Sequence, residues 1–392
     1  MLTDYKKQID TAIEIHSGRL WEISTFLFNN PEIAFKEYKA CQLLTDALMS
    51  SGFTIDIGIG GLETAFRAAF GEESNLKIAI LAEYDALVGL GHACGHNLIA
   101  AAAVGAGMAL AACKPGINGQ IQVIGTPAEE GDGGKIILAN AGVFDSIDAA
   151  MMFHPASKNM VMRPSLACSE LKVEFFGKAS HAAAAPEEGI NALDALLLTF
   201  NNINALRQTL GPKDRVAGII LAGGEASNII PSHTSAEFSV RSLTSTRRDE
   251  LVKKIIVCAQ AGAQTIGCRL EFKVTNGYME IIPNKVLAGF FKSNLESLGR
   301  VVVDPDPNER MGSTDMGDIS HLVPSIHPYL AIAPINVAGH TLEFREYCIS
   351  ESGKSAMLDA AKAIAMTSID LLLNPYLLEI AKDELASALK ST

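Results

Sequence analysis

The sequence predicts an α/β protein: a mostly parallel sheet with helices on both faces, into which a ferredoxin-like α+β domain is inserted. Continuous apolar runs such as Ile78–Ala82 have the composition of strands buried on both faces. Helical stretches with apolar residues near 3.6-residue spacing separate these runs. From about residue 166 the order becomes strand, helix, two strands, helix and strand, which is the split ferredoxin-like unit.

The first part of the chain alternates between helices and strands, as a parallel sheet requires. Gly52 ends the second helix. The expected elements are helices over 3–27 and 31–48, a strand over 78–82, a helix over 98–113, a strand over 121–126, a helix over 133–141 and a strand over 149–153.

The insert begins with the alternating strand 171–175, and the first pattern resumes after Pro283. The insert's further elements are a helix over 190–210, strands over 216–222 and 235–240, a helix over 246–266 and a strand over 268–274. After it we expect a helix over 284–298, a loop over 304–320, a strand over 329–332 and a helix over 350–372. The predicted domains are therefore a discontinuous domain, 1–165 with 284–392, and an inserted domain, 166–283.

Composition excludes several classes of protein. A net charge of −12 over 392 residues argues against nucleic acid as a partner. Seven cysteines without paired spacing indicate reduced thiols in a cytoplasmic protein. The polar N-terminus does not resemble a signal peptide. The longest apolar stretch, 98–113, is shorter than the roughly 20 residues of a bilayer span, so no membrane partner is expected.

Side chains that bind zinc-like cations follow one after another at the ends of the predicted strands. Cys94 and His96 flank a glycine before a helix, Glu129 and Glu130 follow the strand 121–126, and His154 follows the strand 149–153. Thiolate, imidazole and carboxylate are zinc ligands, and strand ends are where open α/β sheets build active sites. The pattern predicts hydrolysis by metal-activated water.

Each of these motifs is, by itself, weak evidence for a metal site. A buried cysteine with a capping histidine also gives Cys-x-His, and adjacent glutamates usually mark a solvated surface. Burying Glu129 and Glu130 together is costly without a cation. One carboxylate of the pair would ligate metal, while the other would deprotonate the water and return the proton to the leaving amine. Asp85 either orients a ligand histidine or caps a turn.

Three later sites add polar groups. His181 follows the insert's first strand, where the alternative is a polar turn. Asn228 lies in a structured turn between strands, and His340 could supply a final imidazole. The remaining histidines are interpreted as structural: His16, His92, His233, His321 and His327.

Taken together, these residues resemble the aminoacylase/carboxypeptidase G family of two-metal peptidases, in the branch of aminobenzoyl-glutamate hydrolases and aminoacylase-like dipeptidases. The matching segments are Ala82–Leu87, Gly91–Asn97, Pro127–Glu130, His154, 180–191, Asn228–Pro231, Gly312–Gly317 and His340. The resemblance implies two divalent ions per subunit, zinc or alternatively manganese or cobalt. It also implies that the insert is a lid that forms a homodimer, with pairing into tetramers left open.

The resemblance also implies roles for single residues. Glu129 would be the general base, Asp85 the orienting aspartate, His181 an oxyanion-stabilising residue that reaches the partner subunit's active site, and Asn228 a substrate-binding residue. The implied metal ligands are Cys94, which bridges the ions, and His96, Glu130, His154 and His340. Three departures from the family pattern, Glu83, Val88 and Asn97, put the substrate in question more than the reaction.

The expected reaction is hydrolysis of an amide bond next to a free carboxylate, in a small N-acyl amino acid or dipeptide. A metal-bound hydroxide would attack the carbonyl, with Glu129 as general base. One alternative is a thiol amidase with Cys94 as the nucleophile and His96 or His154 as its base. The other is a non-catalytic binding protein on the same fold.

Overall fold

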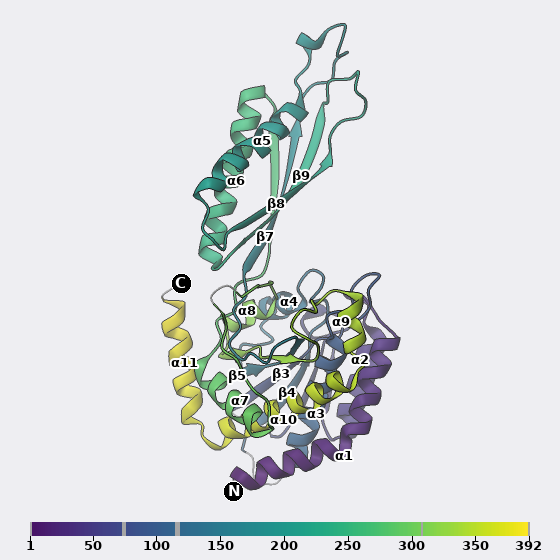
Figure 1. Cartoon of the computed structure of the whole chain (residues 1–392), viewed down its shortest axis with the longest axis vertical. Coiled ribbons are helices and arrows are strands. Elements are labelled where there is room, and N and C mark those ends of the chain that lie inside the picture. Colours follow the sequence, from purple (N-terminus) through teal and green to yellow (C-terminus); the bar gives the residue numbers. More distant parts are fainter. Residues whose placement is uncertain (1, 73–75, 114–117, 307–308, 391–392) are drawn as a thin grey trace. The chain divides into compact units, whose positions relative to one another are not determined.

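The computed structural model describes residues 2–72, 76–113, 118–306 and 309–390 (Figure 1). Within this part, the chain forms two compact units. The larger unit combines the chain up to Pro164 with the chain from Ile281 onward, and the smaller unit is Ser165–Glu280. No helix of the described residues has both the length and the apolarity to cross a membrane.

The larger unit is built on a six-stranded sheet whose centre is parallel. β3, β4, β5 and β11 run parallel, while β2 pairs antiparallel with both β1 and β4. In sheet order the strands are β1 (Thr54–Ile57), β2 (Phe66–Phe70), β4 (Gln120–Gly125), β3 (Lys77–Ala82), β5 (Ala149–Met151) and β11 (Ser325–Ile326). Because β3, β4 and β5 are parallel, the residues that follow them meet at one edge of the sheet.

The apolar Ala/Gly-rich segment that the sequence places after residue 98 is the buried central helix α3 (His96–Ala112). It packs against β3 and β4, and the helices α1 (Leu2–Asn29) and α10 (Glu351–Leu373) pack on it. A Cβ at Gly105 would lie 2.7 Å from Leu20 Cδ1, so the small residue permits the close contact with α1.

A short two-stranded sheet and further helices complete the larger unit. β12 (Tyr329–Ala331) pairs in parallel with β6 (His154–Ala156), which sets Tyr329 opposite His154. The others are α2 (Tyr38–Ser50), η1 (Ile59–Gly61), α4 (Gly134–Asn140), α7 (Lys285–Ser297), α8 (Met316–Ser320), α9 (Leu342–Tyr347) and α11 (Tyr376–Leu389).

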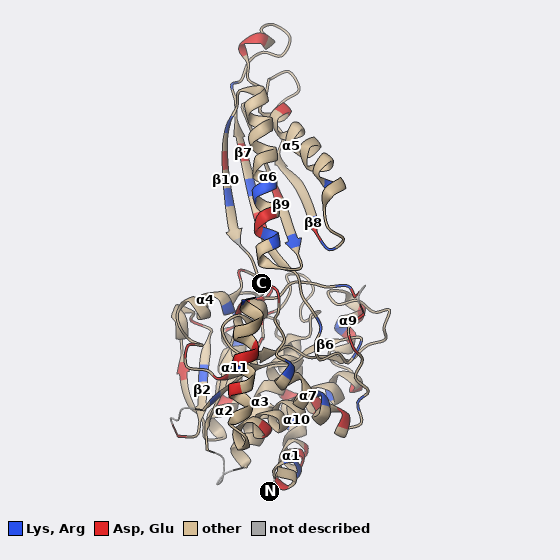
Figure 2. Cartoon of the chain, turned by 90° about the vertical axis from the view of Figure 1, so that its left-hand side faces the viewer, with Lys and Arg blue, Asp and Glu red and all other residues tan. Residues whose placement is uncertain are grey.

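The smaller unit is a four-stranded antiparallel sheet packed against two helices, which run side by side in Figure 2. The strand order is β10-β7-β9-β8, which is that of a ferredoxin-like unit. In chain order its elements are β7 (Ala167–Phe176), η2 (Pro186–Glu188), α5 (Ala192–Leu206), η3 (Arg207–Thr209), β8 (Arg215–Ala222), β9 (His233–Ser242), α6 (Ser245–Ile266) and β10 (Arg269–Asn276).

The predicted fold class is confirmed, and individual boundaries differ for local reasons. The helix predicted from residue 31 begins only at Tyr38, because Phe35 adopts a positive φ of 61° that no helix accommodates. The predicted loop 304–320, of which 307–308 lie outside the described residues, contains the short helix α8. The short strands β1 and β2 and the helices α9 and α11 were not predicted.

Candidate metal centre

Gly95 allows its two neighbours to face the same side at the start of α3. Its φ is 84°, and a Cβ there would lie 2.8 Å from Pro155 Cγ. His96 turns its Nδ1 toward Asp85, 2.9 Å from the carbonyl oxygen and 3.0 Å from Oδ1. His96 Nε2 therefore points away from Asp85; it is buried, has no hydrogen-bond partner among the described residues, and lies 3.5 Å from Glu83 Oε2. This is how a carboxylate orients a histidine ligand.

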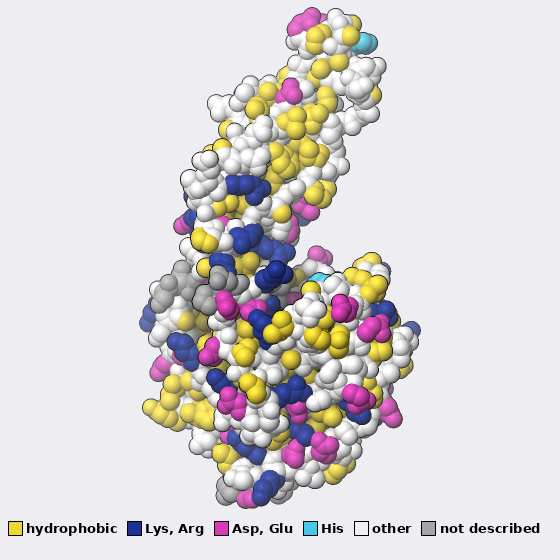
Figure 3. Space-filling model, in the orientation of Figure 1, with side chains coloured by type: hydrophobic (Ala, Val, Ile, Leu, Met, Phe, Trp, Pro, Cys, Tyr) yellow, Lys and Arg dark blue, Asp and Glu magenta, His cyan; other side chains and the backbone are white. Residues whose placement is uncertain are grey.

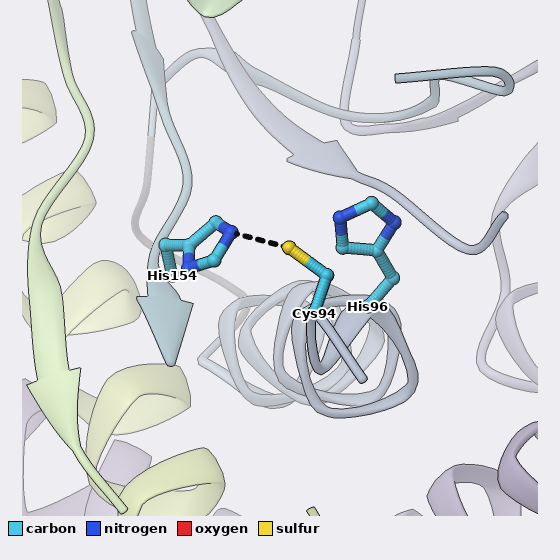
Figure 4. Close-up of side chains that lie close together, drawn as sticks. All are labelled: Cys94, His96 and His154. Carbon is cyan, nitrogen blue, oxygen red and sulfur yellow. Dashed lines mark hydrogen bonds between the residues drawn. The ribbon is translucent and has the colours of Figure 1, made fainter. Parts of the chain in front are cut away.

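Cys94 Sγ contacts two further imidazoles. It lies 3.3 Å from His154 Nε2 and 3.3 Å from His340 Nε2. Figure 4 shows the first contact, with His96 on the other side of the thiol. His154 is held by its Nδ1, which donates to the Pro155 carbonyl at 2.7 Å. His340 has a φ of 61°, so a strained backbone position presents this side chain.

Two groups of possible metal ligands share the Cys94 thiol. One is Cys94, His96 and His154, and the other is Cys94, Glu130 and His340; in each, the ligand atoms lie within 4.8 Å of one another. Glu130 Oε1 lies 3.1 Å from His340 Nε2. The structure thus brings together the five residues that the sequence nominates as ligands.

Glu129 and Asp85 adjoin this cluster. Glu129 Oε2 lies 3.9 Å from His96 Nε2. Asp85 Oδ2 accepts a hydrogen bond from the Glu130 backbone N–H at 2.9 Å, so one aspartate positions both the His96 ring and the Glu130 backbone.

The electrostatics of the cluster favour a cation. Burial raises the pKa of the Cys94 thiol and, together with Glu83 and Asp315, raises the pKa of Glu129. Burial also lowers the pKa of His154 to about 4, which keeps its imidazole neutral and able to ligate. A divalent ion would offset the cost of burying these thiolate and carboxylate groups. The donor types fit such an ion, as does the buried His96 Nε2, which makes no hydrogen bond within the described part of the chain.

Several residues near the cluster were not singled out from the sequence. Lys135 Nζ lies 2.5 Å from Glu83 Oε1 and 2.6 Å from Asp315 Oδ1, and all three side chains are buried. Asp315 lies within the family-like segment Gly312–Gly317, which is a weak indication that it has a role in the site. Lys135 is a single lysine after glycines, and such a pattern gives no indication of a functional role. Glu37, which is also fully buried, binds the loop that precedes Glu129.

His327, interpreted from the sequence as structural, packs directly beside the candidate ligand His154. Its ring centroid lies 5.4 Å from that of His154, and Tyr329 Oη lies 3.4 Å from its Nδ1. Burial lowers the pKa of His327, so the ring is neutral. It therefore packs beside a candidate ligand as an uncharged aromatic group.

His181 and Asn228 lie in the smaller unit, on two segments that pair with each other. The Ala182 N–H donates to the Asn228 carbonyl at 3.0 Å. His181 Nδ1 accepts from the N–H groups of Ala183 and Ala184, each at 3.2 Å, and the side chain is exposed. Because Nδ1 is an acceptor, the proton of the neutral ring lies on Nε2.

Residues 168–264 match the model of the peptidase dimerisation domain. The chain is 39% identical to the Xaa-Arg dipeptidase of Mus musculus, over 96% of this chain and 90% of that protein. It is 28% identical to a subunit of the p-aminobenzoyl-glutamate hydrolase of Escherichia coli, over 96% of this chain and 94% of that protein.

A solved structure has the same fold. It is a dinuclear metal-binding peptidase of the M20 family from Bacillus subtilis, with a TM-score of 0.72 and 20% identity, covering 92% of this chain and 99% of that one. The predicted resemblance to two-metal peptidases and the predicted enzyme class, a metal-dependent hydrolase of amide bonds, are confirmed. The chain belongs to the M20 family of peptidases.

Proposed function

We propose that this protein is a two-metal dipeptidase that cleaves the peptide bond before a C-terminal basic residue. The observation that carries the two-metal mechanism is the pair of ligand groups that share Cys94 Sγ. The substrate is inferred from the 39% identity to an Xaa-Arg dipeptidase over nearly the whole chain. Other small dipeptides and N-acyl amino acids form the wider substrate class.

Each ion would have three protein ligands. Cys94, His96 and His154 would hold one, and Cys94, Glu130 and His340 the other. Zinc suits the thiolate and imidazoles, while the carboxylate also suits manganese or cobalt. Two such ions supply positive charge that polarises the amide carbonyl and lowers the pKa of water.

The remaining steps belong to side chains of this protein. Glu129 would take a proton from water and return it to the leaving amine. Asp85 would fix the His96 ring, as its two contacts with Nδ1 suggest. His181 would donate from Nε2 to the developing oxyanion in the partner subunit, since backbone N–H groups already occupy its Nδ1. Asn228 would bind the substrate near its carboxylate.

The smaller unit would form a homodimer through β8. This strand is at the edge of its sheet, and Ile219, Ile220 and Leu221 are 59%, 46% and 48% exposed. Figure 3 shows hydrophobic side chains gathered along the smaller unit. An exposed edge strand with apolar side chains is a template for pairing with another chain. The match of residues 168–264 to a dimerisation domain supports this assignment.

We also place the protein in the cytoplasm, because none of its seven cysteines is paired in a disulfide. Reducing conditions would keep the Cys94 thiol available as a ligand.

The first experiment is to measure metal content per subunit on protein purified without added metal, together with hydrolysis of an Xaa-Arg dipeptide before and after chelation. About two equivalents, with activity lost to the chelator and restored by zinc or manganese, would support the proposal. Turnover that resists chelation but is blocked by alkylation would instead make Cys94 a nucleophile. Metal-loaded protein inactive on dipeptides and N-acyl amino acids would indicate a binding protein.

A further inference from the structure

Three carboxylates converge beside the candidate metal centre, outside the two ligand groups that share Cys94. Glu83, Glu129 and Asp315 each contribute an oxygen, and these oxygens lie within 4.8 Å of one another. Glu83 and Asp315 are fully buried; among the described residues Glu83 Oε2 has no hydrogen-bond partner, and it lies 3.5 Å from His96 Nε2. Carboxylates this close in a buried site repel one another unless protons or a cation intervene.

The ammonium group of Lys135 lies among these carboxylates. Lys135 is fully buried, and its Nζ lies 2.5 Å from Glu83 Oε1 and 2.6 Å from Asp315 Oδ1. Its backbone N–H also donates to Asp315 Oδ2, at 3.0 Å. Burial alone would lower the pKa of Lys135, but Asp315, Glu83 and Glu129 outweigh burial and raise it, so the side chain is charged.

We propose that Lys135 is the resident cation of a third cation position, formed by Glu83, Glu129 and Asp315, and that it limits the centre to two metal ions. Hard divalent ions prefer carboxylate oxygens, so an unfilled three-carboxylate position would attract such an ion. The ammonium is fixed to the chain and cannot exchange. This inference rests on the proposed two-metal function.

The consequence concerns Glu129. A carboxylate bound to a third metal ion could no longer accept a proton from water, whereas a carboxylate facing a nearby ammonium still can. Lys135 is therefore a positioning residue that keeps Glu129 available as a base. Its loss should reduce kcat far more than it changes KM, because the groups that bind substrate remain in place.

The experiment measures bound manganese per subunit by elemental analysis, after saturation with Mn²⁺ and removal of free ion, in wild type and Lys135→Ala. We expect about one additional equivalent in Lys135→Ala, with kcat reduced about 100-fold and KM nearly unchanged. Lys135→Arg keeps the charge and should keep the wild-type metal count.

Lys362→Ala is a matched control. Lys362 Nζ also lies within 2.6 Å of two carboxylate oxygens, those of Asp10 and Glu14, but it lies between α10 and α1 and away from the centre. Its removal should leave both the metal count and kcat unchanged.

A wild-type metal count in folded Lys135→Ala would overturn the inference. If that variant does not fold, Lys135→Ser leaves similar space and gives the same test, and an unchanged count there has the same meaning. The double variant Lys135→Ala with Asp315→Asn should lose the additional equivalent. If the wild-type protein binds no metal, the two-metal proposal is refuted. The inference about Lys135 is tested separately, by the difference in bound metal per subunit between the variant and the wild type.

Discussion

The Glu37 side chain holds the backbone of Ala128. Glu37 Oε1 accepts hydrogen bonds from the N–H groups of Ala128 and Phe35, each at 3.0 Å. Ala128 and Phe35 have φ values of 62° and 61°, a region that residues with side chains rarely adopt. Ala128 directly precedes Glu129, so a residue near the start of the chain sets the direction of the Glu129–Glu130 pair.

Replacing Glu37 with alanine should therefore impair catalysis. Two strained N–H groups would lose their acceptor, and Thr64 Oγ1, now 2.9 Å from Glu37 Oε2, would lose its partner. We expect a decrease in kcat of about 10- to 100-fold, since small misplacements of catalytic groups have such effects. Steady-state kinetics with Glu32→Ala as control test this, because Glu32 binds the backbone of Lys39 and Ala40 instead. Wild-type kcat in Glu37→Ala would contradict it.

The same residue should make stability depend on pH. Burial raises the pKa of Glu37 from 4.5 to about 7, so the fold favours the neutral carboxyl. Its favourable contribution is full below about pH 4.5 and is lost as the pH rises through about 7. Glu37→Gln, which is always neutral, should be more stable than wild type at pH 8, by at most roughly 3 kcal/mol, and equally stable near pH 4.5. Thermal unfolding of the metal-free proteins at both pH values is the measurement, and a pH-independent difference would refute the prediction.

Glu129→Gln should abolish turnover while metal content stays at the wild-type level. The amide keeps the size of the side chain but cannot take a proton from water, a function worth at least about 100-fold in rate. Kinetics and elemental analysis on the same preparation test both parts. Glu187→Gln, an exposed change in the smaller unit, serves as the control. Unchanged activity in Glu129→Gln would remove Glu129 from the mechanism.

Asp85→Ala should weaken metal binding more than Glu129→Gln does. It removes the carboxylate that accepts from His96 Nδ1 and from the Glu130 N–H, so a ligand in each group loses its support. Loss of such a partner typically lowers metal affinity by about 10- to 100-fold. Competition titration against a chelating dye measures this, and wild-type affinity would show that Asp85 only caps a turn.

A shared active site can be tested with two variants that we expect to be inactive by themselves, His181→Ala and Glu129→Gln. In a mixed dimer of His181→Ala and Glu129→Gln, one site would combine an intact Glu129 with an intact His181 from the other subunit. Partial recovery of activity is therefore expected only if His181 acts across the dimer. Absence of recovery in verified mixed dimers would restrict His181 to its own subunit or to a structural role.

Most of the candidate ligands could be singled out from the sequence because their residue types are distinctive and they lie close to the ends of apolar strands. Cys94, His96, Glu130 and His154 occupy such positions, and the structure brings them together with His340. Lys135 and Glu37 could not be predicted in the same way. A single lysine or glutamate in a polar segment usually lies at the surface, and only tertiary structure brings Lys135 to Asp315, which is 180 residues away.

The sulfur atom common to both ligand groups has a consequence for oxidative damage. If Cys94 ligates both ions as proposed, its conversion to a sulfinic acid would change a ligand of each ion in one chemical event. Inactivation by peroxide should then release the two ions together, with no species that retains a single ion, and metal release followed during oxidation would reveal any such intermediate. Oxidation of the one shared thiol would therefore empty the whole proposed two-metal centre.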